Sequence, residues 1–476
     1  MKIKRIIISS FLVLSLASCH GTLVPKDAVI DIDNGFVIPE EFDETKNYEI
    51  SFWTKNDSDK TQQKIYKDAA EGFSKLYPNV KVNIKQYTNY NDIHRDVVTA
   101  LSNNTTPNIC ITYPDYVASY KTGKDVVYEL DNLINDSNYG LGGAKVKFSS
   151  PKKEEMIDKF LEEGKIDNKY YTLPFMRSSE CLYYNKTYLE ANGFEIPEVF
   201  SWDYIWEVCS YIYDKAATDA EASGKKNEMY PFIYKSSDNM FINLCYQNNN
   251  PYTNEKGDIL MFNDSNNKML LDLYGHFQNK LYELFASVSY PGNHMNKGNC
   301  IFAVDSTAGA TWMGSSAPNL DIDRSEVVEF ETGVSMIPQV DPNNPLMISQ
   351  GPSMCLFNSG DKQKDLASWL FMQYLLTNDV QLKYAKTEGY VPVTKLAIES
   401  AEYKAYLNDD SEYNVKIMAT NVVLDNIDNT FITPVFNGSS KCRTAATYLI
   451  NSISGGDFGT KEKIDNLFKM AKDRYF

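Results

Sequence analysis

The side chains best suited to chemistry in this sequence are aromatic residues that stand next to small polar ones. Hydroxyl and amide groups form directed hydrogen bonds, and the flat face of an aromatic ring packs against the C–H side of a polyol ring. In segments without a clear helix or strand period, tyrosines stand beside small polar residues at 87–90 and 388–390, and further small polar runs lie at 178–179, 305–307, 350–353 and 437–440. The pattern indicates non-covalent recognition of a small polyhydroxylated molecule.

Signatures of catalysis and of metal binding are missing from the sequence. It has no P-loop, no H-E-x-x-H, no G-x-S-x-G and no G-x-G-x-x-G. The four histidines lack the spacing of metal ligands. We therefore expect no metal and no other cofactor, and a binding protein rather than an enzyme. Because a carboxylate pair for glycoside hydrolysis meets only in space, a surface glycan-processing enzyme stays an open alternative.

Composition bounds the partners and the number of domains. The net charge of −16 argues against nucleic acid, whose binding requires clustered lysine and arginine. A chain of 476 residues is long enough for two domains of ordinary size. We expect an acidic, monomeric protein of two domains that does not bind nucleic acid.

The N-terminus has the organisation of an export signal. A basic start at residues 2–5 is followed by an apolar run at residues 6–16, which is too short to span a membrane. The run ends in Leu-Ala-Ser before Cys19, which resembles the lipobox of bacterial lipoproteins. That resemblance implies a signal peptide over residues 1–19, a lipid on Cys19 and a position on the outer face of the cell membrane. Residues 20–46 are acidic and aperiodic, and we expect a flexible tether there.

The other seven cysteines are scattered, and none forms a Cys-x-x-Cys pair. An odd number excludes a complete disulfide framework. Since several lie inside apolar runs, we expect most of them to be buried thiols, and one or two disulfides stay open.

Periodicity at the start of the body predicts the elements that position these side chains. Strand-like alternation at residues 48–53 and 80–85 is separated by a helical pattern at 61–76, and a second helix leads to an apolar strand at 109–113. This order is typical of an α/β unit with a parallel sheet. Ligands bind beyond the carboxyl ends of such strands, which lie near Trp53, Tyr90 and Asp115.

A set of short motifs in a fixed order resembles a known family. Residues 171–179 contain Pro-Phe and a polar run, residues 182–186 read Leu-Tyr-Tyr-Asn-Lys, and residues 193–202 contain Gly-x-x-x-Pro and a tryptophan. Further matching segments lie at residues 73–82, 298–307 and 367–393. Together they resemble the extracellular solute-binding proteins (family 1) of carbohydrate ABC importers, and within them the glycerol-3-phosphate and sugar-binding lipoproteins.

The resemblance implies a two-lobed α/β fold of the periplasmic-binding-protein type (type II) with a hinge between the lobes. We expect residues 47–160 and 300–352 in the first lobe, and residues 161–299 and 353–476 in the second. The resemblance also implies that the lobes close on a sugar, an oligosaccharide or a glycerol phosphate. The closed protein then delivers this ligand to the transmembrane subunits of an ABC permease.

The resemblance also implies ligand-binding residues. The matching elements place Tyr90, Ser178 or Ser179, Ser306, Gly351 and Tyr390 at the ligand. Asp115 takes the place of a glutamate in the relatives, and Arg443 lies where the glycerol-phosphate group has an arginine that grips phosphate. We expect ring stacking from Trp53, Trp312 and Tyr390. A sugar and a glycerol phosphate stay open as ligands, and so does an adhesion lipoprotein that keeps the fold without the pocket.

Overall fold

The computed structural model describes residues 35–55, 60–121 and 126–476. The predicted signal peptide, Cys19 and residues 20–34 of the predicted tether lie outside the described residues. In the part of the chain that the structure describes, no helix is long and apolar enough to cross a membrane. The fold is α/β, as predicted, and is built on two five-stranded sheets.

The first sheet has the strand order β2-β1-β3-β13-β6. Its strands are β1 (Tyr48–Lys55), β2 (Val80–Tyr87), β3 (Ile109–Thr112), β6 (Leu173–Pro174) and β13 (Ser353–Leu356). β1 runs parallel to β2 and β3, which confirms the parallel unit predicted from periodicity. β13 runs antiparallel to both β3 and β6.

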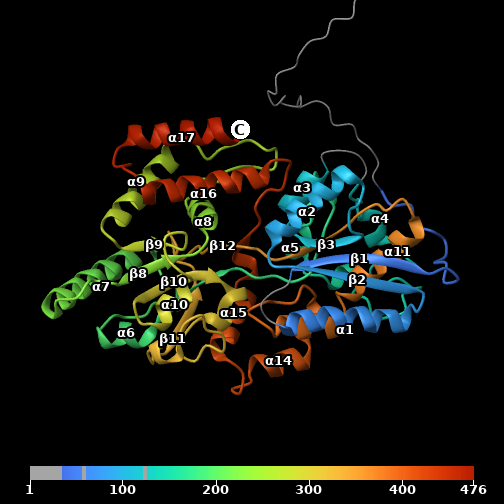
Figure 1. Cartoon of the computed structure of the whole chain (residues 1–476), viewed down its shortest axis with the longest axis horizontal. Coiled ribbons are helices and arrows are strands. Elements are labelled where there is room, and N and C mark those ends of the chain that lie inside the picture. The colour runs from blue at the N-terminus through green and yellow to red at the C-terminus, as the bar shows by residue number, and fades with distance from the viewer. Residues whose placement is uncertain (1–34, 56–59, 122–125) are drawn as a thin grey trace, which may run out of the picture. The chain divides into compact units, whose positions relative to one another are not determined.

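Helices cover both faces of the first sheet, and Figure 1 shows α1 and α2 on opposite sides of it. The covering helices are α1 (Lys60–Leu76), α2 (Tyr90–Asn103), α11 (Lys362–Tyr374) and α12 (Asn378–Ala385). Phe52 of β1 is fully buried between the rings of Tyr66 on α1 and Phe371 on α11. Its neighbour Trp53 packs on the α2 side of the sheet, since successive strand residues point to opposite faces.

The second sheet has the strand order β11-β7-β10-β8-β9. Its strands are β7 (Glu180–Asn185), β8 (Tyr230–Tyr234), β9 (Tyr282–Leu284), β10 (Cys300–Ser306) and β11 (Thr332–Met336). β8, β9 and β10 are parallel, so their carboxyl ends share one edge of the sheet. β7 is antiparallel to β10 and β11.

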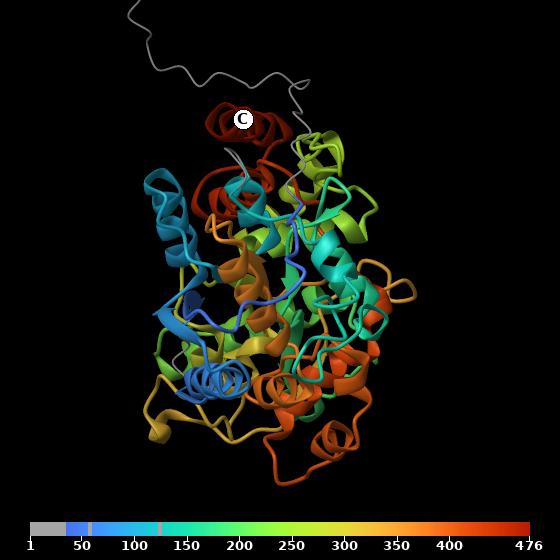
Figure 2. The same cartoon turned by 90° about the vertical axis from the view of Figure 1, so that its right-hand side faces the viewer.

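Five long helices pack with the second sheet around a separate apolar core. They are α7 (Trp202–Ser223), α8 (Ser237–Gln247), α9 (Asp264–Gln278), α16 (Ser439–Gly455) and α17 (Lys461–Tyr475). α16 packs against both α8 and α17, and Figure 2 shows α17 outermost with α16 beneath it. The N-terminal end of α16 is thereby held beside the start of α8.

The remaining elements are short. The helices are α3 (Pro114–Tyr120), α4 (Asp131–Asn135), α5 (Asp158–Glu162), α6 (Lys186–Ala191), α10 (Pro291–Asn296), α13 (Lys395–Glu399), α14 (Ala401–Leu407) and α15 (Asn414–Asp425). Two-residue strands are β4 (Lys165–Ile166), β5 (Lys169–Tyr170), β12 (Met347–Ile348) and β14 (Thr430–Phe431). The 3-10 helices are η1 (Lys153–Glu155), η2 (Thr307–Trp312), η3 (Arg324–Glu326) and η4 (Ile427–Asn429).

Two segments that run side by side connect the sheets, and we call residues 174–180 and 348–353 the crossover. Ser178 and Gln350 exchange backbone hydrogen bonds of 2.8 and 3.1 Å across it. The fully buried guanidinium of Arg177 donates to the carbonyl of Pro352 and to the hydroxyl of Ser353, both at 3.1 Å. Its Nε lies 3.0 Å from Glu163 Oε2, so a buried ion pair fixes the crossover.

The chain is divided between the sheets differently from the expected lobe boundaries. β10 and β11, within residues 300–352, belong to the second sheet rather than the first. β13 and α11, within residues 353–476, belong to the first sheet and its core. The reason is long-range pairing, because β13 adds antiparallel to β3 with Cys355 opposite Cys110.

The described end of the expected tether is part of the folded body. Phe36 and Phe42 are 2% and 8% exposed, and both lie in the core of the first sheet. The backbone N–H of Phe42 donates to the hydroxyl of Tyr139 at 2.8 Å. Residues 35–46 are therefore anchored to the folded body by the two buried rings. The acidic, aperiodic sequence around these rings gave no sign of this packing.

Candidate functional site

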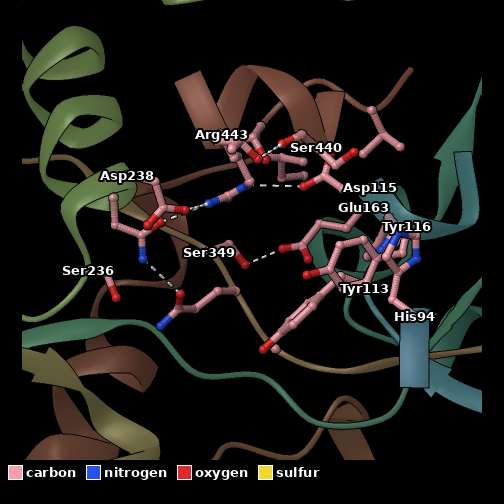
Figure 3. Close-up of a pocket in the computed structure, with 18 of the residues that line it drawn as sticks. His94, Tyr113, Asp115, Tyr116, Glu163, Ser236, Asp238, Ser349, Ser440 and Arg443 are labelled. Atoms are coloured by element: carbon pink, nitrogen blue, oxygen red, sulfur yellow. Dashed lines mark hydrogen bonds and ion pairs between the residues drawn. The ribbon is translucent and has the colours of Figure 1, made fainter. Parts of the chain in front are cut away.

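A cavity of about 610 Å³ lies at the carboxyl ends of strands from both sheets, and we call it the cleft cavity. Tyr113 and Asp115 reach it just after β3 of the first sheet, as predicted from the strand ends. Ser236 and Asp238 reach it just after β8 of the second sheet. The crossover and α16 complete the lining (Figure 3). The position is that of a ligand site in an α/β protein.

Arg443 on α16 is held between two carboxylates in the cleft cavity, as Figure 3 shows. Its Nε lies 3.1 Å from Asp115 Oδ2, and its Nη1 lies 2.8 Å from Asp238 Oδ2. Nη1 also donates to Asn239 Oδ1 at 3.0 Å. Burial by itself lowers the pKa of Arg443, but the two carboxylates outweigh it and raise that pKa above its ordinary value. The guanidinium is thus charged, and its charge is already neutralised by the protein.

A third carboxylate, Glu163, lines the cavity at the crossover. The Ser349 hydroxyl donates to its Oε1, and Arg177 pairs with its Oε2 from behind. Burial raises the pKa of Glu163, and the charge of Arg177 opposes this shift. This carboxylate therefore ties the cavity wall to the buried arginine of the crossover.

Aromatic rings form the wall on the side of the first sheet (Figure 3). His94 stacks on Tyr116 with ring centroids 4.1 Å apart and planes 14° apart. Tyr90 packs behind Tyr113 with centroids 4.7 Å apart. Burial lowers the pKa of His94, so the imidazole is neutral at pH 7. Among the described lining residues, this wall offers ring faces and holds no lysine or arginine.

Three of the residues expected at the ligand from the sequence line the cleft cavity, namely Asp115, Gly351 and Arg443. Gly351 has a φ of 142°, and a Cβ there would lie 2.4 Å from the carbonyl oxygen of Met176. Only glycine fits this position, because any side chain would force the two crossover segments apart.

Four other expected residues lie next to the cavity without lining it. Ser178 holds the crossover through its backbone, and the Ser179 hydroxyl donates to the carbonyl of Ile348. Ser306, at the end of β10, accepts a longer hydrogen bond of 3.4 Å from Gln350 Nε2, and Gln350 itself lines the cavity. Tyr90 is behind Tyr113.

The three residues expected to stack on a ligand ring lie elsewhere. Trp53 packs on Tyr87 and under the ammonium of Lys85. Tyr390 is buried against Tyr384. Trp312 is partly buried at the end of η2. None of the three is part of the cleft cavity in the described structure.

Sequence reasoning missed Asp238, Asn239 and Glu163. Asp238 had a usable signal, because it follows a strand-like run that ends at Tyr234 and opens a helix. Glu163 had none, since contacts with Arg177 and Ser349 place it at the cavity.

The described residues hold no cluster of three or more His, Cys, Asp or Glu side chains that could bind a metal. All seven described cysteines are buried and free.

Many solved structures share this architecture. The chain aligns with UgpB from Mycobacterium tuberculosis in complex with glycerophosphocholine at a TM-score of 0.68 and 16% identity, over 90% of this chain and 98% of the other. Maltose-bound MalE3 from T. maritima gives 0.65 and 15%, over 89% and 99%. Lmo0181 from Listeria monocytogenes in complex with cycloalternan gives 0.67 and 16%, over 90% and 99%. The likeness confirms the predicted two-lobed α/β fold.

At the level of sequence, no curated protein matches this chain. A family model described as bacterial extracellular solute-binding protein matches residues 68–408, which is most of the chain. This match agrees with the motifs at residues 73–82, 171–202 and 367–393. The chain belongs to the bacterial extracellular solute-binding proteins.

Proposed function

We propose that this solute-binding protein captures a neutral carbohydrate in the cleft cavity and delivers it to the permease of an ABC importer. The observation that carries the proposal is the state of Arg443, whose charge is neutralised by Asp115 and Asp238 at 3.1 and 2.8 Å. An arginine in this state orients the two carboxylates and leaves little net positive charge for an anion.

The charge balance of the lining favours a neutral ligand. Among the described lining residues, Arg443 is the one lysine or arginine, whereas Asp115, Asp238 and Glu163 are acidic. A phosphate at Arg443 would lie beside the carboxylates of Asp115 and Asp238, which would repel it. Sugar hydroxyls can instead donate to these oxygens, and hydrogen bonds to ionised acceptors are the strong ones.

The remaining lining suits a sugar ring. Tyr113 and Tyr116 offer ring faces, and Ser236, Ser440 and Thr444 supply hydroxyls around the arginine. A cavity lined by aromatic and small polar groups has the usual composition of a small-molecule site. Of the three similar structures, two contain maltose or cycloalternan, which are neutral glucans, and one contains glycerophosphocholine. A glycerol phosphate is thus the second candidate, and the pairing of Arg443 counts against it.

Closure and localisation follow the same proposal. Asp115 comes from the first sheet and Arg443 from the second, so their contact stabilises the closed arrangement of the lobes around the ligand.

A diacylglyceryl group on Cys19 anchors the protein, as a monomer, to the outer face of the cell membrane.

A thermal-shift screen of the full chain against neutral sugars, oligosaccharides and glycerol phosphates tests the proposal. A ligand at 100 times its Kd adds about 2.7 kcal/mol to the free energy of unfolding. We expect a neutral carbohydrate to raise the Tm. If this carbohydrate is recovered chemically unchanged after incubation with the protein, a glycan-processing enzyme is excluded. Stabilisation by glycerol phosphates alone would favour the second candidate. If nothing in the panel raises the Tm, an adhesion lipoprotein becomes the better account.

A further inference from the structure

An asparagine that precedes a glycine is chemically labile, and the described residues hold two such pairs. They are Asn192-Gly193 and Asn437-Gly438. The backbone nitrogen of the glycine attacks the side-chain carbonyl carbon of the asparagine, because glycine has no Cβ to block the approach. The rate of this reaction depends on how firmly the folded protein holds the asparagine side chain and the glycine N–H. The two pairs differ in exactly these restraints.

The first pair is held in place at the end of α6. Asn192 Nδ2 donates to the carbonyl of Tyr188 at 2.8 Å, and Asn192 Oδ1 accepts a hydrogen bond of 3.1 Å from the hydroxyl of Tyr211. The N–H of Gly193 donates to the carbonyl of Glu190 at 3.0 Å. Attack on the side chain would require breaking these hydrogen bonds, so the fold protects Asn192.

The second pair has none of these restraints. Asn437 is exposed, and neither its side chain nor the N–H of Gly438 forms a hydrogen bond among the described residues. Gly438 has a φ of 112°, and a Cβ added there would contact only the Phe436 ring, at 3.8 Å. The space around the glycine is therefore open, and the two reacting groups are free to meet.

Asn437 also lies just before the helix that carries the arginine of the cleft cavity. Gly438 is the N-cap residue of α16, and its carbonyl accepts a hydrogen bond of 3.2 Å from the N–H of Cys442. Arg443 follows directly and pairs with Asp115 in the cavity (Figure 3). A change in the backbone at Asn437 therefore acts on the end of α16 that positions Arg443.

We propose that Asn437 is a site of spontaneous deamidation, and that its conversion to isoaspartate loosens the first turn of α16. The Gly438 nitrogen forms a bond to Asn437 Cγ, the C–N bond of the side-chain amide breaks, and ammonia leaves with the proton of the attacking N–H. Water then opens the cyclic imide. Opening at one carbonyl gives aspartate, and opening at the other gives isoaspartate, whose backbone is longer by one methylene. This modification does not depend on which ligand the cavity binds.

Prolonged incubation of the full chain at mildly alkaline pH tests the site. Peptide mapping by mass spectrometry follows the conversion of both asparagines and distinguishes isoaspartate from aspartate. We expect Asn437 to convert at least about tenfold faster than Asn192, because the hydrogen bonds at Asn192 must break before attack. Amide hydrogen exchange in the first turn of α16 should become faster in the incubated parent protein. It should stay unchanged in Asn437→Gln, whose longer side chain closes the ring more slowly.

The matched control is Tyr211→Phe, which removes one of the hydrogen bonds that hold Asn192. We expect this variant to convert faster at Asn192 and at an unchanged rate at Asn437. Absence of conversion at Asn437, or conversion at Asn192 that is equally fast in the parent protein, overturns the proposal. Isoaspartate at Asn437 without faster exchange in α16 also overturns it. None of these results bears on the proposed function, which the thermal-shift screen tests separately.

Discussion

Arg443 and Asp115 meet across the cleft cavity, with Nε and Oδ2 3.1 Å apart, and join α16 of the second sheet to α3 beside the first. The arginine that the sequence motif associates with phosphate is therefore engaged by the protein's own carboxylates. Asp238 completes this engagement from α8. We propose that the number of carboxylates around this guanidinium, rather than the arginine alone, determines which ligand charge the cavity accepts.

Removing one carboxylate should change the preference for ligand charge. In Asp115→Asn the guanidinium has one anionic partner in place of two, so an oxyanion competes for it more readily. We expect the affinity for a phosphate monoester, relative to its neutral parent sugar, to rise about tenfold, or about 1.4 kcal/mol. Isothermal titration of both ligands gives this ratio. Asp409→Asn, in an exposed turn, is the control, and an unchanged ratio in Asp115→Asn argues against the charge account.

The buried pair in the crossover should contribute strongly to stability. Arg177→Ala leaves Glu163 buried without its countercharge, which costs about 3–5 kcal/mol of the free energy of unfolding. Urea unfolding of the full chain measures the loss. Arg95→Ala removes an arginine whose side chain is 68% exposed, and little change is expected there. Adding Glu163→Gln to Arg177→Ala should recover part of the loss, and no recovery would contradict an electrostatic cause.

Stability should fall as pH rises toward neutrality because of Glu180. Burial raises the pKa of Glu180 from 4.5 to about 7 in the folded protein, where Tyr234 and Asn243 donate to its Oε2. The folded state therefore binds a proton that the unfolded state releases between pH 4.5 and 7, and the free energy of unfolding decreases over this window. The full change amounts to about 3 kcal/mol.

Glu180→Gln removes this titration and keeps a hydrogen-bonding side chain. We expect the variant to be the more stable protein at pH 8 and to lose this part of the slope between pH 4.5 and 7. Denaturant unfolding at a series of pH values measures both. Parallel curves for the parent protein and the variant would show that Glu180 titrates normally.

Packing of the N-terminal segment is tested by two neighbouring residues. Phe36 is 2% exposed and lies edge-on to the Tyr128 ring at 5.0 Å, whereas Val37 is 64% exposed. Phe36→Ala should cost about 3–5 kcal/mol in urea unfolding, as for other buried phenylalanines. Val37→Ala should cost little. If both substitutions have equal, small effects on the free energy of unfolding, the segment is not packed and the flexible tether extends to residue 46.

Local patterns were sufficient for the parts of the fold that depend on neighbours in the chain. Alternation in β1 and β2 and the apolar spacing of Ile65, Ala69 and Phe73 gave the parallel unit, and the end of β3 gave Asp115. These signals are local because strand and helix periods are properties of short segments.

Contacts between distant segments left no such signal. The antiparallel pairing of β13 with β3 joins residues 245 positions apart. It places β13 in the first sheet, although residues 353–476 were expected in the second lobe. Glu163 reaches the cavity through its contacts with Arg177 and Ser349. The paired state of Arg443 depends on α3, α8 and α16 together, so the motif identified the residue and the fold determined its partners.

The most direct test of the central claim is a calorimetric comparison of two ligands that differ only in charge. The full chain is titrated, at fixed ionic strength, with the neutral sugar that raises the Tm most and with the phosphate monoester of that sugar. Since Asp115 and Asp238 already neutralise Arg443, we expect the neutral sugar to bind at least about tenfold more tightly. Equal or tighter binding of the phosphorylated sugar would contradict the account and make Arg443 a phosphate-binding residue.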